Sequence, residues 1–172
     1  EPRAARDVVH ACGRLPLALW VAGARLATRP HLRLGELASA LADERRRLDE
    51  LAVADVAVRD SLERVYRGLT APTRRALRHL GLLPAGPLPA RGFASWDLAA
   101  LLDVSLPHAE RAIDDLIEMH LVEPCPAGRF RLPDLVRLFA RERACQEEDP
   151  SSRARVLRRL AEGRLDTLPA GA

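Results

Sequence analysis

The side chains that most often carry chemistry form no recognisable catalytic or metal-binding pattern in this sequence. None of the five histidines pairs with another histidine or a glutamate at the spacing that places two metal ligands on one helix face. Cys12, Cys125 and Cys145 lie far apart and form no C-x-x-C pair. A phosphate-binding P-loop needs a lysine, and the sequence contains none. We therefore expect no catalytic residues and no metal site, which excludes an enzyme complete within this chain.

Pro16 is the residue whose position best suits contact with a ligand. Gly13 ends a preceding helical pattern, and Pro16 then stands in the first turn of a strongly apolar helix. A rigid proline ring at a helix start offers an apolar face beside exposed N–H groups. From the residues alone, the simpler interpretation is a proline that only starts a helix.

The elements that would position Pro16 form a small helical domain over residues 1–52. Apolar residues at helical spacing predict helices over 2–12, 16–28 and 34–47. Leu48, Leu51 and Val53 continue into a connector.

A second domain is predicted over residues 56–146, in the element order of a winged helix. The pattern comprises helices over 56–68, 71–81, 95–102, 107–119 and 134–145, a proline-glycine loop over 84–92, and a hairpin whose strands, 121–124 and 129–132, flank the turn 125–128. A further helical region begins over 151–168, and we expect its packing partners to lie outside this chain. The fold class is thus mainly α: a small helical bundle followed by a winged-helix domain with a two-stranded β-hairpin wing.

The composition agrees with a helical protein and says little about partners. Hydrophobic residues make up 48% but aromatic residues only 3%, which suits helix-on-helix packing. All 27 cationic residues are arginine, which is typical of a very GC-rich genome, so the net charge of +3 is weak support for nucleic-acid binding. The longest uncharged apolar run, 15–24, is too short to span a bilayer. With unpaired cysteines and no initiator methionine, we expect a cytoplasmic fragment of a longer protein.

The charge of the second helix of the helix-turn-helix argues against direct DNA reading. Helix 107–119 carries Glu110, Asp114, Asp115 and Glu118 against the single Arg111. Bringing this face to a polyanion costs energy, whereas a cationic face would release counterions. Arg129 and Arg131 leave open a phosphate contact by the hairpin. The alternative function at this point is a stand-alone winged-helix DNA-binding transcription factor.

Several strings resemble the NB-ARC domains of STAND-type nucleotide switches, in the version found in actinobacterial regulators of the AfsR/SARP type. The resemblance covers nearly the whole chain, in order. It is carried by CGRLPLAL (12–19), VAGARL (21–26), LADERRRLDEL (41–51), VRDSL (58–62), YRGL (66–69), LGLLP (80–84) and RFRLPDLVRLFARE (129–142).

The resemblance implies a regulatory module that acts within a larger machine. A P-loop ATPase domain would precede the chain, residues 1–52 would form the ARC subdomain, and the winged helix would close over bound ADP or ATP. A helical or repeat sensor domain would follow, and activation could involve an oligomer. The parent protein would control transcription of secondary-metabolite genes and contact DNA only through another domain, with no membrane association.

The same resemblance supplies the candidate nucleotide-binding residues. The motif proline that lies against the adenine corresponds to Pro16, flanked by Leu15 and Leu17. The first glycine of the motif is replaced by Arg14, a mild change because Gly13 can supply the turn. A histidine that contacts the β-phosphate of ADP is replaced by Pro133, which has no donor. We expect Asp134 to cap the following helix, and expect a weakened ADP lock or one that uses Arg129, Arg131 or Arg137.

Overall fold

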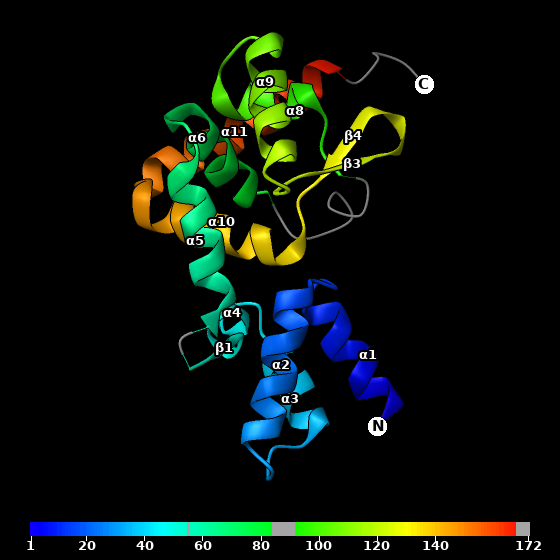
Figure 1. Ribbon diagram of the computed structural model, residues 1–172. Helices are drawn as coiled ribbons and strands as arrows, with labels where there is room; N and C mark the ends of the chain where they lie inside the picture. The colour runs from blue at the N-terminus through cyan, green and yellow to red at the C-terminus, as the bar shows by residue number, and fades with distance from the viewer. Residues whose placement is uncertain (55, 84–91, 168–172) are drawn as a thin grey trace. The chain divides into compact units, whose positions relative to one another are not determined.

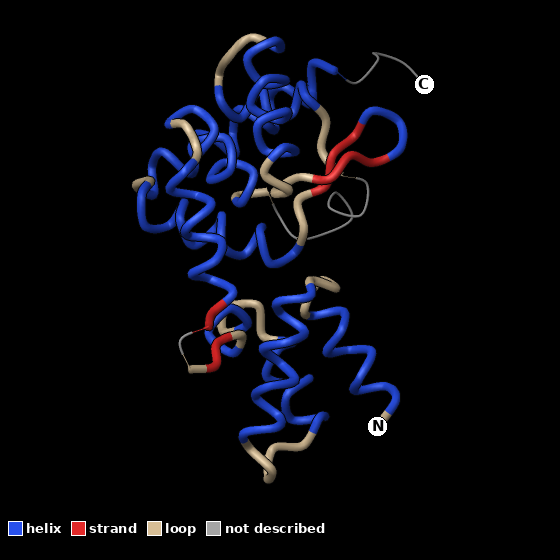
Figure 2. The backbone as a smooth tube through the Cα atoms, viewed as in Figure 1, coloured by secondary structure: helices blue, strands red, loops and turns tan. Residues whose placement is uncertain are grey.

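The computed structural model describes residues 1–54, 56–83 and 92–167, and it divides the chain into two compact units, Glu1–Gly68 and Leu69–Ala172. Both units are built mainly of helices, and each contains a short antiparallel pair of strands (Figures 1 and 2). The predicted mainly α fold with a β-hairpin is confirmed. The predicted loop 84–92 lies outside the described residues except for Gly92. Within the described ranges, no helix has the length and apolar character needed to cross a membrane.

The first unit is a bundle of three helices followed by shorter elements. Its order is α1 (Pro2–Ala11), α2 (Pro16–Thr28), α3 (Leu34–Ala42), α4 (Arg47–Glu50), β1 (Ala52–Val53), β2 (Val56–Ala57) and α5 (Val58–Gly68). Helix α1 packs against α3 and α2. The fully buried Cys12 belongs to this core, and burial raises the pKa of its thiol to about 11.

The predicted helix over 34–47 is correct as far as Ala42 and wrong over residues 43–46. The carboxylate of Asp43 accepts a hydrogen bond from the Arg45 N–H at 3.0 Å, which stabilises a turn where the periodicity suggested more helix. Arg47 then begins α4, and its Nε donates to the Leu41 carbonyl at 2.6 Å. The chain therefore folds back on the end of α3. There the Arg47 side chain supplies a donor to a carbonyl that the helix itself leaves without a partner.

The predicted connector after residue 48 contains structure of its own. Strands β1 and β2 pair in antiparallel register, with Val53 opposite Val56. Helix α5 follows directly and packs against α2 and α4. The division by contacts thus groups α5 with the first unit, whereas the sequence assigned residues 56–68 to the winged helix.

The second unit contains the helix-turn-helix and the hairpin. Its elements are α6 (Ala71–Gly81), α8 (Ser95–Leu102), α9 (Leu106–Glu118), β3 (Glu123–Cys125), the 3₁₀ turn Pro126–Gly128, β4 (Arg129–Arg131), α10 (Asp134–Glu147) and α11 (Pro150–Thr167). Phe93, between α6 and α8, forms an antiparallel bridge with Phe130 of β4. Helix, bridge, helix, helix and hairpin follow one another along the chain in this order.

Helix α11 has a partner inside this unit, contrary to expectation. It packs against α8, and Val156 and Leu160 are both buried. An amphipathic pattern shows that a helix has an apolar face but does not identify the neighbour that covers it.

The turn between α1 and α2 takes an unusual backbone conformation at two successive residues. Gly13 has a φ of 60° and Arg14 a φ of 57°. Only glycine occupies this left-handed region without a steric cost. Replacement of the motif glycine by Arg14 is therefore a less mild change than the sequence suggested, because arginine carries a Cβ at a position that favours glycine.

Replacing this arginine with glycine should stabilise the first unit. We expect Arg14→Gly to have a free energy of unfolding about 0.5–1 kcal/mol above that of Arg14→Ala, because both variants lose the exposed side chain and only the first removes the Cβ. Denaturant unfolding of the two variants measures the difference. Equal stability would show that the positive φ carries no cost here.

Helices α6 and α10 pack so closely at Gly81 that there is no room for a side chain at this position. A Cβ built on Gly81 would lie 2.5 Å from the backbone carbon of Ala140 and 2.5 Å from the backbone nitrogen of Arg141. Backbone atoms cannot yield as a flexible side chain can. Gly81 is thus needed for close packing, and its helical position requires no positive φ.

We expect Gly81→Ala to lower the free energy of unfolding by about 1–3 kcal/mol, because the added methyl group overpacks the α6–α10 crossing. Gly23→Ala is the matched control: Gly23 lies within α2, and its added Cβ would meet no atom within 4 Å. That variant should gain up to about 1 kcal/mol from helix propensity. Thermal or denaturant unfolding compares them, and the same sign of change in both would contradict the packing argument.

Candidate functional site

The predicted nucleotide-contacting residues of the first unit lie at the exposed start of α2. Leu15 is the N-cap residue in extended conformation, and Pro16 is the first helical residue, as predicted. No side chain caps this end, and its first turn contains no acidic residue. The first intrahelical bond runs from the Leu19 N–H to the Leu15 carbonyl at 3.0 Å. The N–H groups of Leu17 and Ala18 thus have no intrahelical acceptor, so this end carries partial positive charge.

The apolar surface at this helix start is larger than the sequence indicated. Ala18, Val21 and Ala22 bury the inner face of α2, whereas Leu17 is 36% and Trp20 57% exposed. Pro16 and Trp20 are four residues apart, so they lie on the same side of the helix. Sequence reasoning placed Trp20 within an apolar helix and missed its exposure, because α2 is apolar on more than one face.

Pro133 and Asp134 lie at the start of α10, in the second unit. Asp134 was expected to cap this helix, and this expectation is wrong: Pro133 occupies the N-cap position, and no side-chain cap bond is formed. Asp134 is the first helical residue, where its charge still interacts favourably with the helix dipole. The candidate residues therefore lie at two helix starts in different units: Leu15–Leu17 at the start of α2 and Pro133–Asp134 at the start of α10.

The arginines considered as substitutes for the missing histidine have contacts within the second unit. Arg131 forms an ion pair with Glu123 across the hairpin, and this contact raises the pKa of its guanidinium. Arg129 donates to the Gly92 carbonyl at 2.7 Å and lies 3.6 Å from a carboxylate oxygen of Asp97. Arg137 is buried in α10, with 5% exposure. The contacts of Arg129 and Arg131 hold the hairpin, but the Arg131 side chain is still 58% exposed. Arg137, being buried, has little surface to offer a phosphate.

The exposed surface of α9 is acidic, as predicted. Glu110, Asp114 and Glu118 are exposed on successive turns and form one strip, which we call the acidic strip. Asp115 also lies on the surface, and one of its oxygens accepts a hydrogen bond from the buried Thr73 hydroxyl at 2.6 Å. The arrangement repels phosphate along the helix that a winged-helix DNA reader would insert in the major groove.

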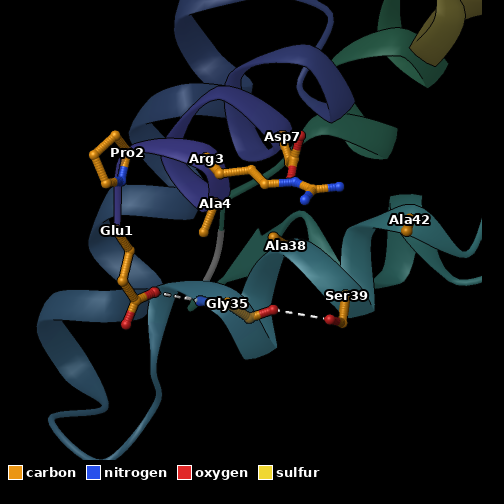
Figure 3. A pocket seen from close by; sticks show the side chains of 9 residues that line it. All are labelled: Glu1, Pro2, Arg3, Ala4, Asp7, Gly35, Ala38, Ser39 and Ala42. Atoms are coloured by element: carbon orange, nitrogen blue, oxygen red, sulfur yellow. Dashed lines mark hydrogen bonds between the residues drawn. The ribbon is translucent and has the colours of Figure 1, made fainter.

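The first unit also contains a hollow that could hold a ligand. It has a volume of about 480 Å³ and lies between α1 and α3 (Figure 3). Its wall consists largely of small residues such as Ala38 and Ala42, and two of its lining side chains, Glu1 and Ser39, bond to the backbone of Gly35. The Glu1 carboxylate accepts from the Gly35 N–H at 2.9 Å, and the Ser39 hydroxyl donates to the Gly35 carbonyl at 2.9 Å. Within the described ranges, no group of three or more potential metal ligands occurs.

Two curated proteins are similar to this chain over nearly its whole length. Regulatory protein AfsR of Streptomyces coelicolor is 43% identical over 173 residues, which cover 97% of this chain and 17% of that protein. Regulatory protein AfsR of Streptomyces griseus is 46% identical over 165 residues, which cover 96% of this chain and 16% of that protein. Neither a protein-family model nor a solved structure matches the chain. The chain thus spans about a sixth of the length of the relatives it matches.

Proposed function

We propose that this chain is the ARC and winged-helix module of a larger cytoplasmic regulator of transcription, and that it closes over ADP or ATP held by a P-loop domain elsewhere in the same protein. The observation that carries the proposal is the similarity to one segment of two AfsR regulatory proteins, at 43% and 46% identity. A segment covering about a sixth of such proteins is the size of a module. The downstream partner would be a helical or repeat sensor domain.

The start of α2 supports a role beside a bound nucleotide. It combines an exposed proline ring, the exposed side chains of Leu17 and Trp20, and backbone N–H groups without a cap. An adenine needs an apolar surface and hydrogen-bonding groups at its edge, and a neighbouring domain needs an apolar surface on which to dock. With little else to enclose a ligand, the module by itself should have little or no affinity for nucleotide.

The start of α10 supports a weakened contact with the nucleotide phosphates. Pro133 lacks a backbone donor, Arg137 is buried, and Arg129 and Arg131 already contact groups of the second unit. If the closed state is normally held by a histidine at this position, the present chain would release ADP more readily.

We expect Pro133→His, made in a full-length regulator that contains this chain, to tighten ADP binding by about ten- to a hundredfold, because a hydrogen bond to a charged group contributes about 1.5–3 kcal/mol. Calorimetric titration with ADP measures the change. The control is Pro150→His, a proline exposed at the start of α11. If Pro133→His binds ADP no more tightly than the control, the weakened lock is rejected.

The acidic strip on α9 supports assigning DNA binding to another domain. A stand-alone winged-helix transcription factor would present cations on this helix, whereas the chain presents Glu110, Asp114 and Glu118 there. The hairpin arginines pair with Glu123, Gly92 and Asp97. The alternative function therefore has little support in the second unit.

We expect the chain to show no salt-dependent binding to duplex DNA at about 0.1 M salt. Reversing the acidic strip with Glu110→Arg, Asp114→Arg and Glu118→Arg should create binding that falls steeply as salt rises. A control with the same change in net charge reverses exposed acids on other helices, Asp7, Asp60 and Glu162. Fluorescence anisotropy measures both. Strong duplex binding by the unmodified chain would favour the DNA-reading alternative.

A further inference from the structure

A groove in the second unit takes no part in the proposed nucleotide switch. It has a volume of about 640 Å³ and runs between the start of α6, the end of α8 and one side of α9. Its size is within the range of sites that hold a small molecule or a few side chains of a peptide. All of its lining residues belong to the second unit, so the groove is complete without the first.

The charged side chains of the groove are mainly cationic. Arg75 of α6 and Arg111 of α9 line it together with His108, and both arginines are exposed residues. Among the described residues, neither arginine forms an ion pair; Arg75 donates one hydrogen bond to the Leu102 carbonyl at 3.2 Å. The one lining carboxylate, Asp115, accepts the Thr73 hydroxyl at one oxygen and keeps its negative charge, so Arg75, Arg111 and Asp115 together carry a net charge of +1. The groove thus offers two guanidinium groups to an anionic partner.

The groove also has an apolar wall. Val104 lies in the turn between α8 and α9. It is 37% exposed, so neither helix covers it fully. Leu102 and Ala112 continue this wall beneath it. A small inorganic anion would leave the wall uncovered, whereas an apolar side chain flanked by carboxylates would use both the wall and the arginines.

We propose that this groove binds an acidic peptide segment of a partner protein, with a leucine-like side chain against Val104 and carboxylates on Arg75 and Arg111. Complementary charge selects the peptide, and the limited volume restricts the contact to a short segment. Duplex DNA fits less well, because its phosphates would extend past the groove onto the neighbouring acidic strip of α9. The proposal concerns the second unit only and does not depend on nucleotide binding.

The test is fluorescence anisotropy of the whole chain with a short labelled peptide of alternating Glu-Glu and Leu-Leu pairs, compared with the same peptide carrying lysine in place of glutamate. We expect the acidic peptide to bind and the basic peptide to bind at least about tenfold more weakly. Arg111→Glu should lower the affinity for the acidic peptide by about three- to tenfold and reduce the effect of salt on binding. The control Arg141→Glu changes an exposed arginine of α10 outside the groove and should leave the affinity unchanged.

Circular dichroism establishes that each variant is folded before its affinity is compared. Equal binding of the acidic and basic peptides, no binding of the acidic peptide, or equal effects of Arg111→Glu and Arg141→Glu would overturn the proposal. Binding of duplex DNA that Arg111→Glu abolishes would also overturn it, and would assign the groove to phosphate. Val104→Asp provides a second variant. It should lower the affinity for the acidic peptide although both arginines are retained, because it removes apolar surface and adds a carboxylate that repels the peptide's carboxylates.

Discussion

Gly81 lets α6 approach α10 so closely that one added carbon would meet the backbone of Ala140. Once α6 is held there, its other side chains connect it to each neighbour. The buried Thr73 hydroxyl bonds to Asp115 of α9 at 2.6 Å, the buried His79 ring bonds to the Leu101 carbonyl of α8 at 3.1 Å, and Arg78 bonds to Glu148 beyond α10 at 2.8 Å. Burial lowers the pKa of His79, which favours the neutral form of the ring. The hairpin and the groove are positioned by helices that all pack on or next to this one.

The sequence predicted most helices because their apolar residues repeat at the helical period. It failed where short-range hydrogen bonds or neighbours decide the outcome. Asp43 turns the chain inside an otherwise helical pattern, and strands β1 and β2, at two residues each, are too short to show alternation. The partners of α5 and α11 were also missed, since an apolar face does not identify what it packs against.

In the candidate site too, local features were predicted from the sequence and features that depend on tertiary packing were missed. The helix start at Pro16 and the acidity of α9 are local properties, and the sequence predicted both. The exposure of Trp20 depends on which face of α2 the bundle covers, and the N-cap at Pro133 displaces Asp134 by one position. The groove was not predicted, because Arg75, Val104 and Arg111 come from three segments that only the fold brings together.

The central claim is that the chain contributes to nucleotide binding without holding the nucleotide alone. The most direct test is calorimetric titration of ADP into a full-length regulator that contains the chain, into the same protein lacking residues 1–172, and into the isolated chain. The account expects tight binding only by the full-length protein. Unchanged ADP affinity after the deletion, or binding of comparable affinity by the isolated chain, would contradict it.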